Sequence, residues 1–554
     1  MKRLFVFVSL ALVLLAFILT DGKVSAQTTP TPQVTQFTVL PREVNMSGGS
    51  RKNLEARLGV FNINSKVSST DPSTTGLDFD TLISSCQTTG LHFFGLTDSS
   101  TNLTLRTFFL LRGTALAKAA LNQVPLTGFR WSGESGIAGA GNVKITVIGA
   151  DKFTYYSAGG QKKTVGTTYS LLDYINPSMT DSNGTQVYTS ERTYVKLIQN
   201  GTAKISGSSS FGEITSALNT YLEYWTAQGT NLDVVLGGET LKELRKDMEN
   251  RVNTVNDSSN IRTPKMSFDD LNSWIMLEGN SNGYMCSMFC YPDGVTDIST
   301  WGDNFFKNQY DTTTPEYYHL AEVRAGTGTT FDDTFYRKAL QYGWKVGPAV
   351  SLNNTDTVGE SAASSFTGVW CDTITSYNKL QLMQNILAGI RQRRTFVSSL
   401  PTVHPRLTVA GTSSQSNAQI EGDTITSNQP VIIDLALATE KQEDRIMVFK
   451  PVLVVMYNDN TERVFPFNSY YQDVTGHGPN TVKVDRLYRR IVDKMDNIRC
   501  FYGRVDVYRI MKKVGETTQF DDTWSYYKIW KYFIYPKLTS EHYQTISAPI
   551  YVKI

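Results

Sequence analysis

The feature that most constrains the fold is a change of hydrophobic pattern near residue 403. From about 51 to 402, short apolar runs alternate with longer segments of mixed polarity, as strands and helices alternate in α/β domains. From 403 to 554, the runs are β-rich and separated by turn residues, at a spacing typical of a β-sandwich of roughly immunoglobulin size. The sequence therefore predicts an α/β domain over 51–402 and a β-sandwich domain over 403–554.

Individual elements follow from the same runs. The clearest helix is Tyr377–Arg391, where apolar residues recur at helical spacing and arginines follow at the C-terminal end, which suits the helix dipole. The other elements expected before 403 are the strands Leu58–Ile63, His92–Leu96, Val143–Ile148, Leu232–Leu236 and Ser273–Leu277 and the helices Thr107–Leu121, Ser170–Ile175, Phe211–Gln228 and Thr240–Val252. The strands expected after 403 are Val431–Ala438, Asp444–Tyr457, Thr461–Phe467, Arg504–Ile510, Ser525–Tyr535 and Ile546–Ile554, with Val482–Met495 as a candidate inserted helix.

The first 26 residues have the three parts of a secretory signal peptide. Lys2 and Arg3 precede an almost wholly apolar run, and Val24-Ser25-Ala26 supplies a small-residue cleavage site. A membrane anchor is the alternative, but the apolar run is short for a transmembrane helix. Residues 27–50 are expected to be a linker, Thr/Pro/Gln-rich at first, with an added strand within Val34–Leu40. We therefore expect a secreted, periplasmic or cell-surface protein with no transmembrane segment after signal cleavage.

Charge and cysteine content exclude some classes of protein. The 53 basic and 51 acidic residues give a net charge of +2, so the chain has no strong electrostatic attraction to nucleic acid. Five cysteines are too few for a disulfide scaffold. Cys286 and Cys290 are a disulfide candidate if the chain turns between them, because a continuous strand would hold them too far apart. The other three lie in apolar contexts and are expected to be buried thiols.

Two segments near the start of the α/β region resemble a known enzyme family. Gly59-Val60-Phe61-Asn62-Ile63-Asn64-Ser65 resembles a Gly-Asp-x-His-x-His-Ser strand, and the segment 90–100 resembles a buried strand that ends in Thr-Asp-His-Ser. Such segments open the PHP (polymerase and histidinol phosphatase) family of metal-dependent phosphoesterases. Further similar segments are 339–348, 367–370, 393–397 and 547–552, the last of which resembles the end of secreted PHP hydrolases. The resemblance implies a distorted seven-stranded PHP-like β/α barrel followed by a C-terminal β-sandwich.

The resemblance breaks at the positions where the family holds its metals. PHP enzymes gather imidazoles and carboxylates around two or three metal ions, which bind phosphoryl oxygens and generate hydroxide. Amides or a hydroxyl replace the imidazoles at Asn62, Asn64, Ser99 and Asn142. Only Asp98 and Glu134 keep their carboxylates. The sequence therefore predicts that classical phosphoesterase chemistry and its transition metals are lost.

These six positions define a remnant cleft with two interpretations. In the first, the cleft belongs to a PHP-like pseudoenzyme without a cofactor, which binds an extracellular ligand or protein or self-assembles, and its amides are satisfied by hydrogen bonds to one another, the backbone and water. In the second, Asn62, Asn64, Asp98 and Glu134 bind Ca²⁺ or Mg²⁺, since all four offer oxygen ligands. The second interpretation makes the protein a divergent metal-dependent hydrolase that uses Asp98 and Glu134.

Overall fold

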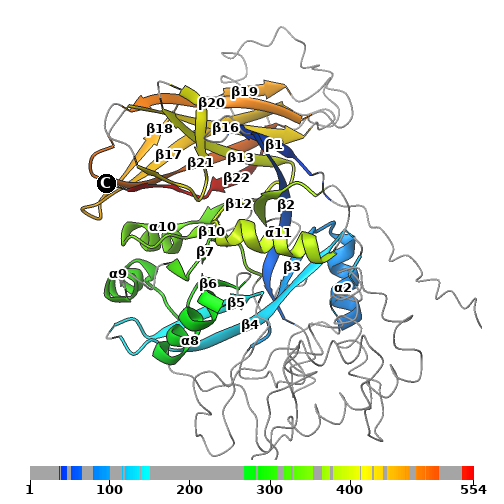
Figure 1. The fold of residues 1–554 in the computed structure, drawn as a ribbon, viewed down its shortest axis with the longest axis vertical. Coiled ribbons are helices and arrows are strands. Elements are labelled where there is room, and N and C mark those ends of the chain that lie inside the picture. Colours follow the sequence, from blue (N-terminus) through cyan, green and yellow to red (C-terminus); the bar gives the residue numbers. More distant parts are fainter. Residues whose placement is uncertain are drawn as a thin grey trace, which may run out of the picture.

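The computed structural model has a mixed α/β fold with more strand than helix (Figure 1). The residues it describes are 37, 39–45, 51–64, 79–99, 115, 119–120, 122–137, 139–149, 268–281, 285–309, 316–325, 329–352, 365–374, 379–411, 414–426, 430–440, 446–467, 470–473, 482–492, 495–510 and 540–553. Within them, the strands form one large mixed sheet, a four-stranded antiparallel sheet and a two-stranded sheet. The predicted signal peptide lies outside the described residues.

Seven strands of the large sheet pair in a closed circuit. In order of pairing they are β2 (Arg51–Ile63), β3 (Phe93–Leu96), β4 (Val124–Glu134), β5 (Asn142–Ile148), β6 (Cys286–Cys290), β7 (Leu320–Glu322) and β10 (Gly347–Ala349). Neighbours are parallel except on both sides of β5. Just beyond β10, Ser351 forms a parallel bridge with Phe61 of β2, so the pairing returns to the strand where it began.

The side chains of these strands alternate between two hydrophobic cores, as the two-residue period of a strand requires. On β6, Cys286, Met288 and Cys290 share an inner core with helix α11 (Lys379–Arg391), whereas Phe289 belongs to an outer core. The aliphatic residues that α11 contributes to the inner core are Leu382, Ile386, Leu387 and Ile390. Their helical spacing is the pattern that predicted this helix from the sequence.

Four other helices pack against the outer core. They are α2 (Phe79–Thr88), α8 (Phe268–Ser281), α9 (Ile298–Gln309) and α10 (Thr334–Gln341). The carboxylate of Asp297 accepts hydrogen bonds from the backbone N–H groups of Ser299 and Thr300, which caps the start of α9. The outer core is rich in aromatic rings, among which Phe289 stacks on Tyr318 with ring centroids 4.1 Å apart.

The described residues beyond β12 (Thr395–Ser398) lie mostly in strands. The four-stranded sheet contains β13 (Val403–Gly411), β14 (Ser414–Ile420), β16 (Val431–Glu440) and β20 (Val482–Val492). The large sheet continues with β15 (Thr424–Thr426), β17 (Ile446–Tyr457), β18 (Glu462–Pro466), β19 (Tyr470–Asp473), β21 (Ile498–Ile510), β22 (Ser540–Ser547) and β23 (Ile550–Lys553). Leu407 and Leu435 of the smaller sheet share a core with Phe449 and Phe501 of the larger one. The two sheets therefore bury a common set of apolar side chains.

Backbone pairing crosses the boundary predicted at 402/403. Strand β11 (Phe366–Asp372) pairs with β2 and β12, and β12 pairs in turn with β22. Strand β1 (Pro41–Asn45) lies in the predicted linker, yet it pairs with β2, and its Arg42 forms a buried ion pair with Glu421 at 2.5 Å. Residues 41–45 are thus part of the sheet rather than a linker.

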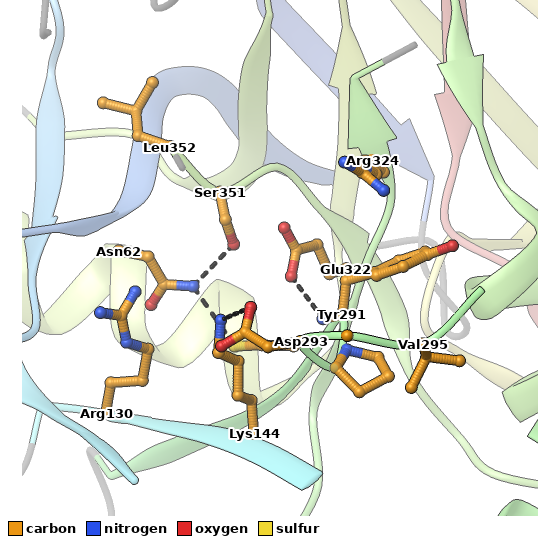
Figure 2. A pocket seen from close by; sticks show the side chains of 13 residues that line it. Asn62, Arg130, Lys144, Tyr291, Asp293, Val295, Glu322, Arg324, Ser351 and Leu352 are labelled. Atoms are coloured by element: carbon orange, nitrogen blue, oxygen red, sulfur yellow. Dashed lines mark hydrogen bonds and ion pairs between the residues drawn. The ribbon is translucent and has the colours of Figure 1, made fainter. Parts of the chain in front are cut away.

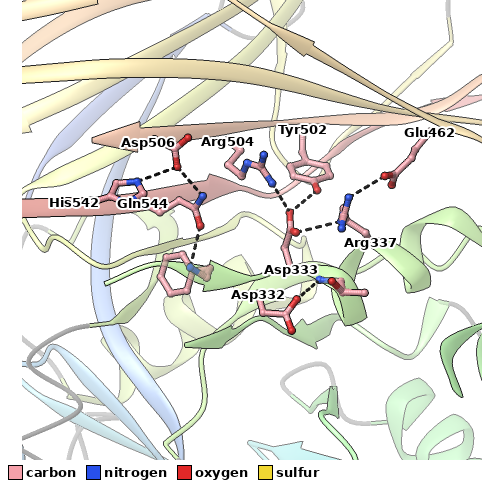
Figure 3. A network of polar contacts seen from close by, with 11 residues as sticks. Asp332, Asp333, Arg337, Glu462, Tyr502, Arg504, Asp506, His542 and Gln544 are labelled. Atoms are coloured by element: carbon pink, nitrogen blue, oxygen red, sulfur yellow. Dashed lines mark hydrogen bonds and ion pairs between the residues drawn. The ribbon is translucent and has the colours of Figure 1, made fainter. Parts of the chain in front are cut away.

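A polar network also joins the two regions beside the two-stranded sheet of β8 (Arg324–Ala325) and β9 (Phe331–Asp332) (Figure 3). The buried carboxylate of Asp333 accepts a hydrogen bond from the Tyr502 hydroxyl at 2.9 Å and pairs with Arg337 at 3.1 Å. Arg337 also pairs with Glu462 of β18 at 2.8 Å. The carboxylate thus links α10 to strands of the C-terminal region.

Two expected elements are wrong and several are confirmed. Ser273–Leu277 is not a strand but part of α8, because Leu271 and Ile275 are buried at helical spacing. Val482–Met495 is not a helix, because its first eleven residues form β20, which pairs along β16. The confirmed strands correspond to β2, β3, β5, β16, β17, β18 and β21, with ends that differ by a residue or two except that β2 and β21 begin several residues earlier, and the C-terminal run falls on β22 and β23.

Other expected elements cannot be compared with the structure. Strands Leu232–Leu236 and Ser525–Tyr535 and helices Ser170–Ile175, Phe211–Gln228 and Thr240–Val252 lie outside the described residues, as does nearly all of Thr107–Leu121. In the part of the chain that is described, no helix has both the length and the apolar character needed to cross a bilayer.

Candidate functional site

A cavity of about 260 Å³ lies where several strands of the seven-strand circuit end (Figure 2). Asn62 near the end of β2, Cys290 at the end of β6, Glu322 at the end of β7 and Ser351 just beyond β10 all line it. Helix α11 contacts the other end of β6, where the Cys286 thiol lies 3.6 Å from the Leu387 carbonyl oxygen. The cavity and α11 therefore occupy opposite ends of β6.

Asn62 organises the wall of this pocket. Its amide nitrogen donates to the Ser351 hydroxyl at 2.7 Å and to the Cys290 sulfur at 3.3 Å. Its amide oxygen accepts from the Thr97 hydroxyl at 3.0 Å and from the Thr146 hydroxyl at 2.6 Å. The side chain thereby uses both of its N–H donors and both oxygen lone pairs. It is 3% exposed, and it holds together segments from five places in the chain.

The backbone at Asn62 explains part of the residue choice. Its φ is +60°, in the left-handed region, where asparagine is tolerated better than other non-glycine residues. The register between β2 and β3 also shifts between Val60 and Ile63, at the same place. This local irregularity turns the Asn62 side chain into the pocket wall.

The β4–β5 hairpin contributes two cations to the pocket. Arg130 pairs across the hairpin with Thr146, and Lys144 pairs with Ser132, so both cationic side chains leave the same face of the hairpin. Arg130 is 8% exposed as a residue and lines the pocket, and its guanidinium donates no hydrogen bond to another described residue. Lys144 forms an ion pair with Asp293 at 2.5 Å, although that carboxylate is largely exposed.

A third cation lies on the opposite wall. Arg324 of β8 places its guanidinium 5.0 Å from the centroid of the Tyr291 ring. Among the described residues that line the pocket, three side chains are thus cationic and two, Asp293 and Glu322, are acidic. The pocket is consequently suited to a ligand that carries negative charge.

Glu322 is the buried acid of the pocket. It is 5% exposed, and one carboxylate oxygen accepts the backbone N–H of Tyr291 at 2.6 Å. Burial raises the pKa of Glu322, while the hydrogen bond from the Tyr291 N–H, the charges of Lys144 and Arg130 and the neighbouring Ser351 act in the opposite direction. The Tyr291 N–H donates to the carboxylate, so Glu322 serves as an acceptor in this arrangement.

The thiol of Cys290 is not suited to nucleophilic chemistry. Burial raises its pKa to about 11, chiefly by desolvation, with Glu322 adding to the shift. Because the thiolate is the reactive form of cysteine, a thiol that stays protonated near neutral pH is inert. Its contacts with Asn62 and Thr146 make it part of the pocket wall.

The predicted disulfide between Cys286 and Cys290 is wrong. Both cysteines lie on the continuous strand β6, and both thiols are free. Four residues of strand separate two Cα atoms by about 13 Å, whereas a disulfide needs roughly 4.4–6.8 Å. The two thiols instead lie at opposite ends of the inner core.

The structure brings only part of the remnant cleft together. Asn62 lines the pocket, and Ser99 forms a bridge with Arg130 next to the buried Asp98. Asn64 is half-buried just beyond β2 and does not line the pocket. Glu134 and Asn142 face each other, exposed, at the tip of the β4–β5 hairpin.

The carboxylates of Asp98 and Glu134 therefore do not meet in one site. Asp98 precedes Ser99, which pairs with Arg130, and Glu134 lies four residues further along β4. That separation is about 13 Å along the strand. A shared metal ion or a paired acid and base would require the two groups to lie much closer together.

The pocket does not fit a cation either. In the described residues, no group of three or more His, Cys, Asp and Glu side chains is placed to hold a metal ion. Asp293 is paired with Lys144, and Glu322 lies within the electrostatic influence of Lys144 and Arg130. These cations repel a divalent ion, so neither a transition metal nor Ca²⁺ or Mg²⁺ suits this donor set.

Sequence analysis alone missed Arg130, Lys144, Asp293, Glu322 and Arg324. One signal was available, because Glu322 is an acid at the end of the apolar run Leu320–Ala321 and thus lies at a strand end. Arg130 and Lys144 gave no such signal, since each alternates with apolar residues as any solvent-facing strand residue does. Only the hairpin register reveals that they share a face.

Comparisons of this chain with models of protein families, with curated proteins and with solved structures found no match.

Proposed function

We propose that this protein is a catalytically degenerate, PHP-like binding protein whose pocket holds a small ligand instead of hydrolysing a phosphoester. The observation that carries this proposal is that Asn62 and Arg130 line the same pocket. A fully hydrogen-bonded amide stands at the place proposed for a metal-binding imidazole, and a largely buried arginine whose guanidinium donates no hydrogen bond to another described residue lies in the same pocket. Such a pocket attracts an anion and does not activate water.

Several features of the fold support the PHP-like part of the proposal. The closed circuit of seven paired strands is compatible with a distorted seven-stranded barrel, and the pocket lies at the strand ends where barrel enzymes hold their sites. Asn62 lies in a segment that resembles the family, and it hydrogen-bonds Ser351, which closely follows the similar segment 339–348. The shared core of the two C-terminal sheets supports the proposed β-sandwich.

The chemistry of the pocket favours binding over hydrolysis. Asn62 cannot act as a base, and the Cys290 thiol stays protonated near neutral pH. Arg130 and Lys144 are well placed to attract an oxyanion, but neither provides a way to generate hydroxide. The alternative, a divergent hydrolase using Asp98 and Glu134, is less well supported because the two residues lie far apart along β4.

We further propose that the protein acts outside the cytoplasm, either as a ligand-binding protein or as a component of a larger assembly. The proposed signal peptide is the basis for this location. All five cysteines are buried as free thiols, which shields them from oxidants in a secretory or periplasmic compartment. Burial thus prevents the unwanted oxidation that an exposed, unpaired cysteine would undergo.

The proposal is tested by metal analysis and a phosphoesterase assay on the purified mature protein. We expect no stoichiometric zinc, manganese or iron, and no turnover of phosphomonoesters or phosphodiesters above background. Asp98→Asn and Glu134→Gln should not change this result, and they serve as matched variants for the alternative. The proposal is wrong if the protein binds about one equivalent of metal and Asp98→Asn abolishes both the binding and a measurable hydrolysis.

A further inference from the structure

Arg130 lines the pocket without an ion pair to a carboxylate of the described residues. Its side chain is more than nine-tenths buried, and no carboxylate or carbonyl among the described residues accepts a hydrogen bond from it. Burying an ionised group without a partner is costly, and a guanidinium presents a planar fork that matches two oxygens of an oxyanion. The pocket thus has a place for an anion between Arg130 and the cations of Lys144 and Arg324 (Figure 2).

The cavity volume limits the size of that anion. About 260 Å³ is below the roughly 300–1,000 Å³ of pockets that enclose drug-sized ligands. The ligand is therefore a molecule of few heavy atoms, on the scale of an inorganic oxyanion or a short carboxylic acid. No large apolar surface lines the pocket, in which Leu352 and Val295 are the aliphatic side chains among the described lining residues.

Glu322 places a second requirement on the ligand, which concerns its hydrogen-bonding groups. Its carboxylate accepts a hydrogen bond from the Tyr291 N–H, and it has further lone pairs available. Arg130, Lys144 and Glu322 line the same small cavity, so a ligand held by these cations lies near the carboxylate. A fully deprotonated oxyanion would be repelled there, whereas an oxyanion with an O–H group would donate a hydrogen bond.

We propose that the pocket selects a small oxyanion that carries its own hydroxyl donor, with Arg130 holding the charge and Glu322 accepting the hydroxyl proton in a hydrogen bond. This inference rests on the proposed function and names the ligand class of the same site. Hydrogen phosphate and short hydroxy acids both satisfy it. Sulfate and unsubstituted carboxylic acids do not, because they have no O–H group near neutral pH.

Asn62 has a positioning role in this scheme. Its amide donates to the Ser351 hydroxyl oxygen, so the Ser351 proton is not used in that hydrogen bond. Asn62 thereby orients the Ser351 hydroxyl in the wall of the pocket that also contains Glu322. The amide that replaced the family's imidazole thus serves a purpose that an ionised imidazole could not serve beside Arg130.

The test is isothermal titration calorimetry of the mature protein near neutral pH with two matched pairs of probes. The pairs are inorganic phosphate with sulfate, and lactate with propionate, so each pair differs mainly in the O–H group. We expect the donor-bearing member of at least one pair to bind about 100-fold or more tightly than its partner, since like-charge contact and an unmade hydrogen bond are both costly. The pair that shows this preference identifies the ligand as a phosphate or a hydroxy acid.

Single-residue variants test which side chains cause the preference for a probe that carries an O–H group. Glu322→Gln should remove most of the discrimination, because an amide can donate to an oxygen that lacks a proton. Arg130→Gln should weaken binding roughly 10- to 100-fold, as expected for a lost charge-assisted hydrogen bond. Lys553→Gln, on β23 away from the pocket, removes the same charge and should leave the affinity unchanged.

Several outcomes would overturn the inference. They are equal affinity for both members of each pair, no binding of any of the four probes, or discrimination that persists in Glu322→Gln. If Arg130→Gln fails to fold, the selectivity of the unaltered protein and of Glu322→Gln still decides the question. Failure here is distinguishable from failure of the proposed function, which is decided separately by phosphoester turnover and metal content.

Discussion

The two ends of the seven-strand circuit are built from different side chains. At the end covered by α11, aliphatic residues of the helix pack on the starts of β4 and β6, and the inner core there is fully buried. At the other end, a hydrogen-bonded amide, two acids and three cations surround a cavity. Cys286 and Cys290 mark the contrast, since they lie on one face of β6 and differ only in which end they occupy.

This difference indicates that the two ends of the strands have different roles, one in stability and the other in binding. The closed end gains stability from apolar burial, at roughly 25 cal/mol for each Å² removed from water. The open end keeps charged groups partly desolvated, which costs stability and provides binding. Changes at the closed end should therefore alter mainly the free energy of unfolding, and changes to the charged groups at the open end should alter mainly ligand affinity.

Acidification should have the largest effect on the free energy of unfolding. It acts through buried histidines, two of which lie at the closed end. His92 precedes β3, His319 precedes β7 and His404 lies on β13; burial lowers the pKa of His92 and His404 to about 3 and that of His319 well below its ordinary value. His92 and His319 each accept a backbone N–H at Nδ1, so that nitrogen must be unprotonated.

The direction of the change in stability with pH follows from proton uptake. Below pH 6.5 the unfolded chain protonates these histidines while the folded protein does not, so stability falls as the pH falls. Each histidine contributes up to about 1.4 kcal/mol per pH unit between its unfolded and folded pKa values. Chemical denaturation at a series of pH values measures the slope. A free energy of unfolding that stays constant from neutral pH down to about pH 5 would contradict the prediction.

Ile386→Ala should have the next largest effect. Ile386 is fully buried on α11 against the inner core, and removing its side chain leaves a cavity that should lower the free energy of unfolding by about 2–5 kcal/mol. Gln381→Ala, on the exposed side of the same helix, should change it by less than about 0.5 kcal/mol. Denaturant unfolding compares the two variants, and similar losses in both would show that α11 does not close a rigid core.

The folded Ile386→Ala protein should bind inorganic phosphate or lactate as the unaltered protein does, because the pocket lies at the other end of the strands. Calorimetry below the unfolding transition measures this. A matching loss of affinity would mean that the two ends are coupled.

The sequence was most informative where the apolar pattern is long. Helix α11, which covers the closed end, and strands β16 and β17 of the C-terminal region were predicted because long apolar patterns leave few alternatives. Strand β20 was mistaken for a helix because its apolar residues are interspersed with arginines, and its pairing with β16 depends on residues distant in sequence. The role of β1 was missed for the same reason, since Arg42 finds its partner Glu421 only in the folded chain.

The pocket could be predicted only in part. Asn62 was found because it occupies a recognisable position in a family-like segment. Glu134 was assigned to the same site by the same logic, yet the length of the β4–β5 hairpin places it at an exposed tip. Arg130, Lys144 and Glu322 come from different strands, and they become neighbours through sheet register and closure, which no local pattern encodes.

Asn62→Ala should have an intermediate effect, at the open end. It removes four side-chain hydrogen bonds and leaves hydroxyls of Thr97, Thr146 and Ser351 without that partner. It also places alanine at a φ of +60°. We expect a loss of about 2–4 kcal/mol in the free energy of unfolding.

Asn62→Gly is the matched control, since it loses the same hydrogen bonds but relieves the backbone strain. It should be more stable than Asn62→Ala by about 1 kcal/mol. Equal stability of the two variants, measured by denaturant unfolding, would show that the left-handed backbone has no role in placing this side chain.

Lys144→Gln should have the smallest effect on stability, and it should separate stability from ligand affinity most clearly. Its partner Asp293 is 69% exposed, and an ion pair with one exposed member contributes about 0–1 kcal/mol. Loss of the positive charge should nevertheless weaken binding of the preferred oxyanion severalfold, because Lys144 lies beside Glu322 in the pocket. Asp293→Asn, which frees the lysine charge, should strengthen the same binding. If both variants shifted affinity in the same direction, the charge of Lys144 would not be what attracts the ligand, and the contrast between the two ends of the circuit would rest on Arg130 and Arg324.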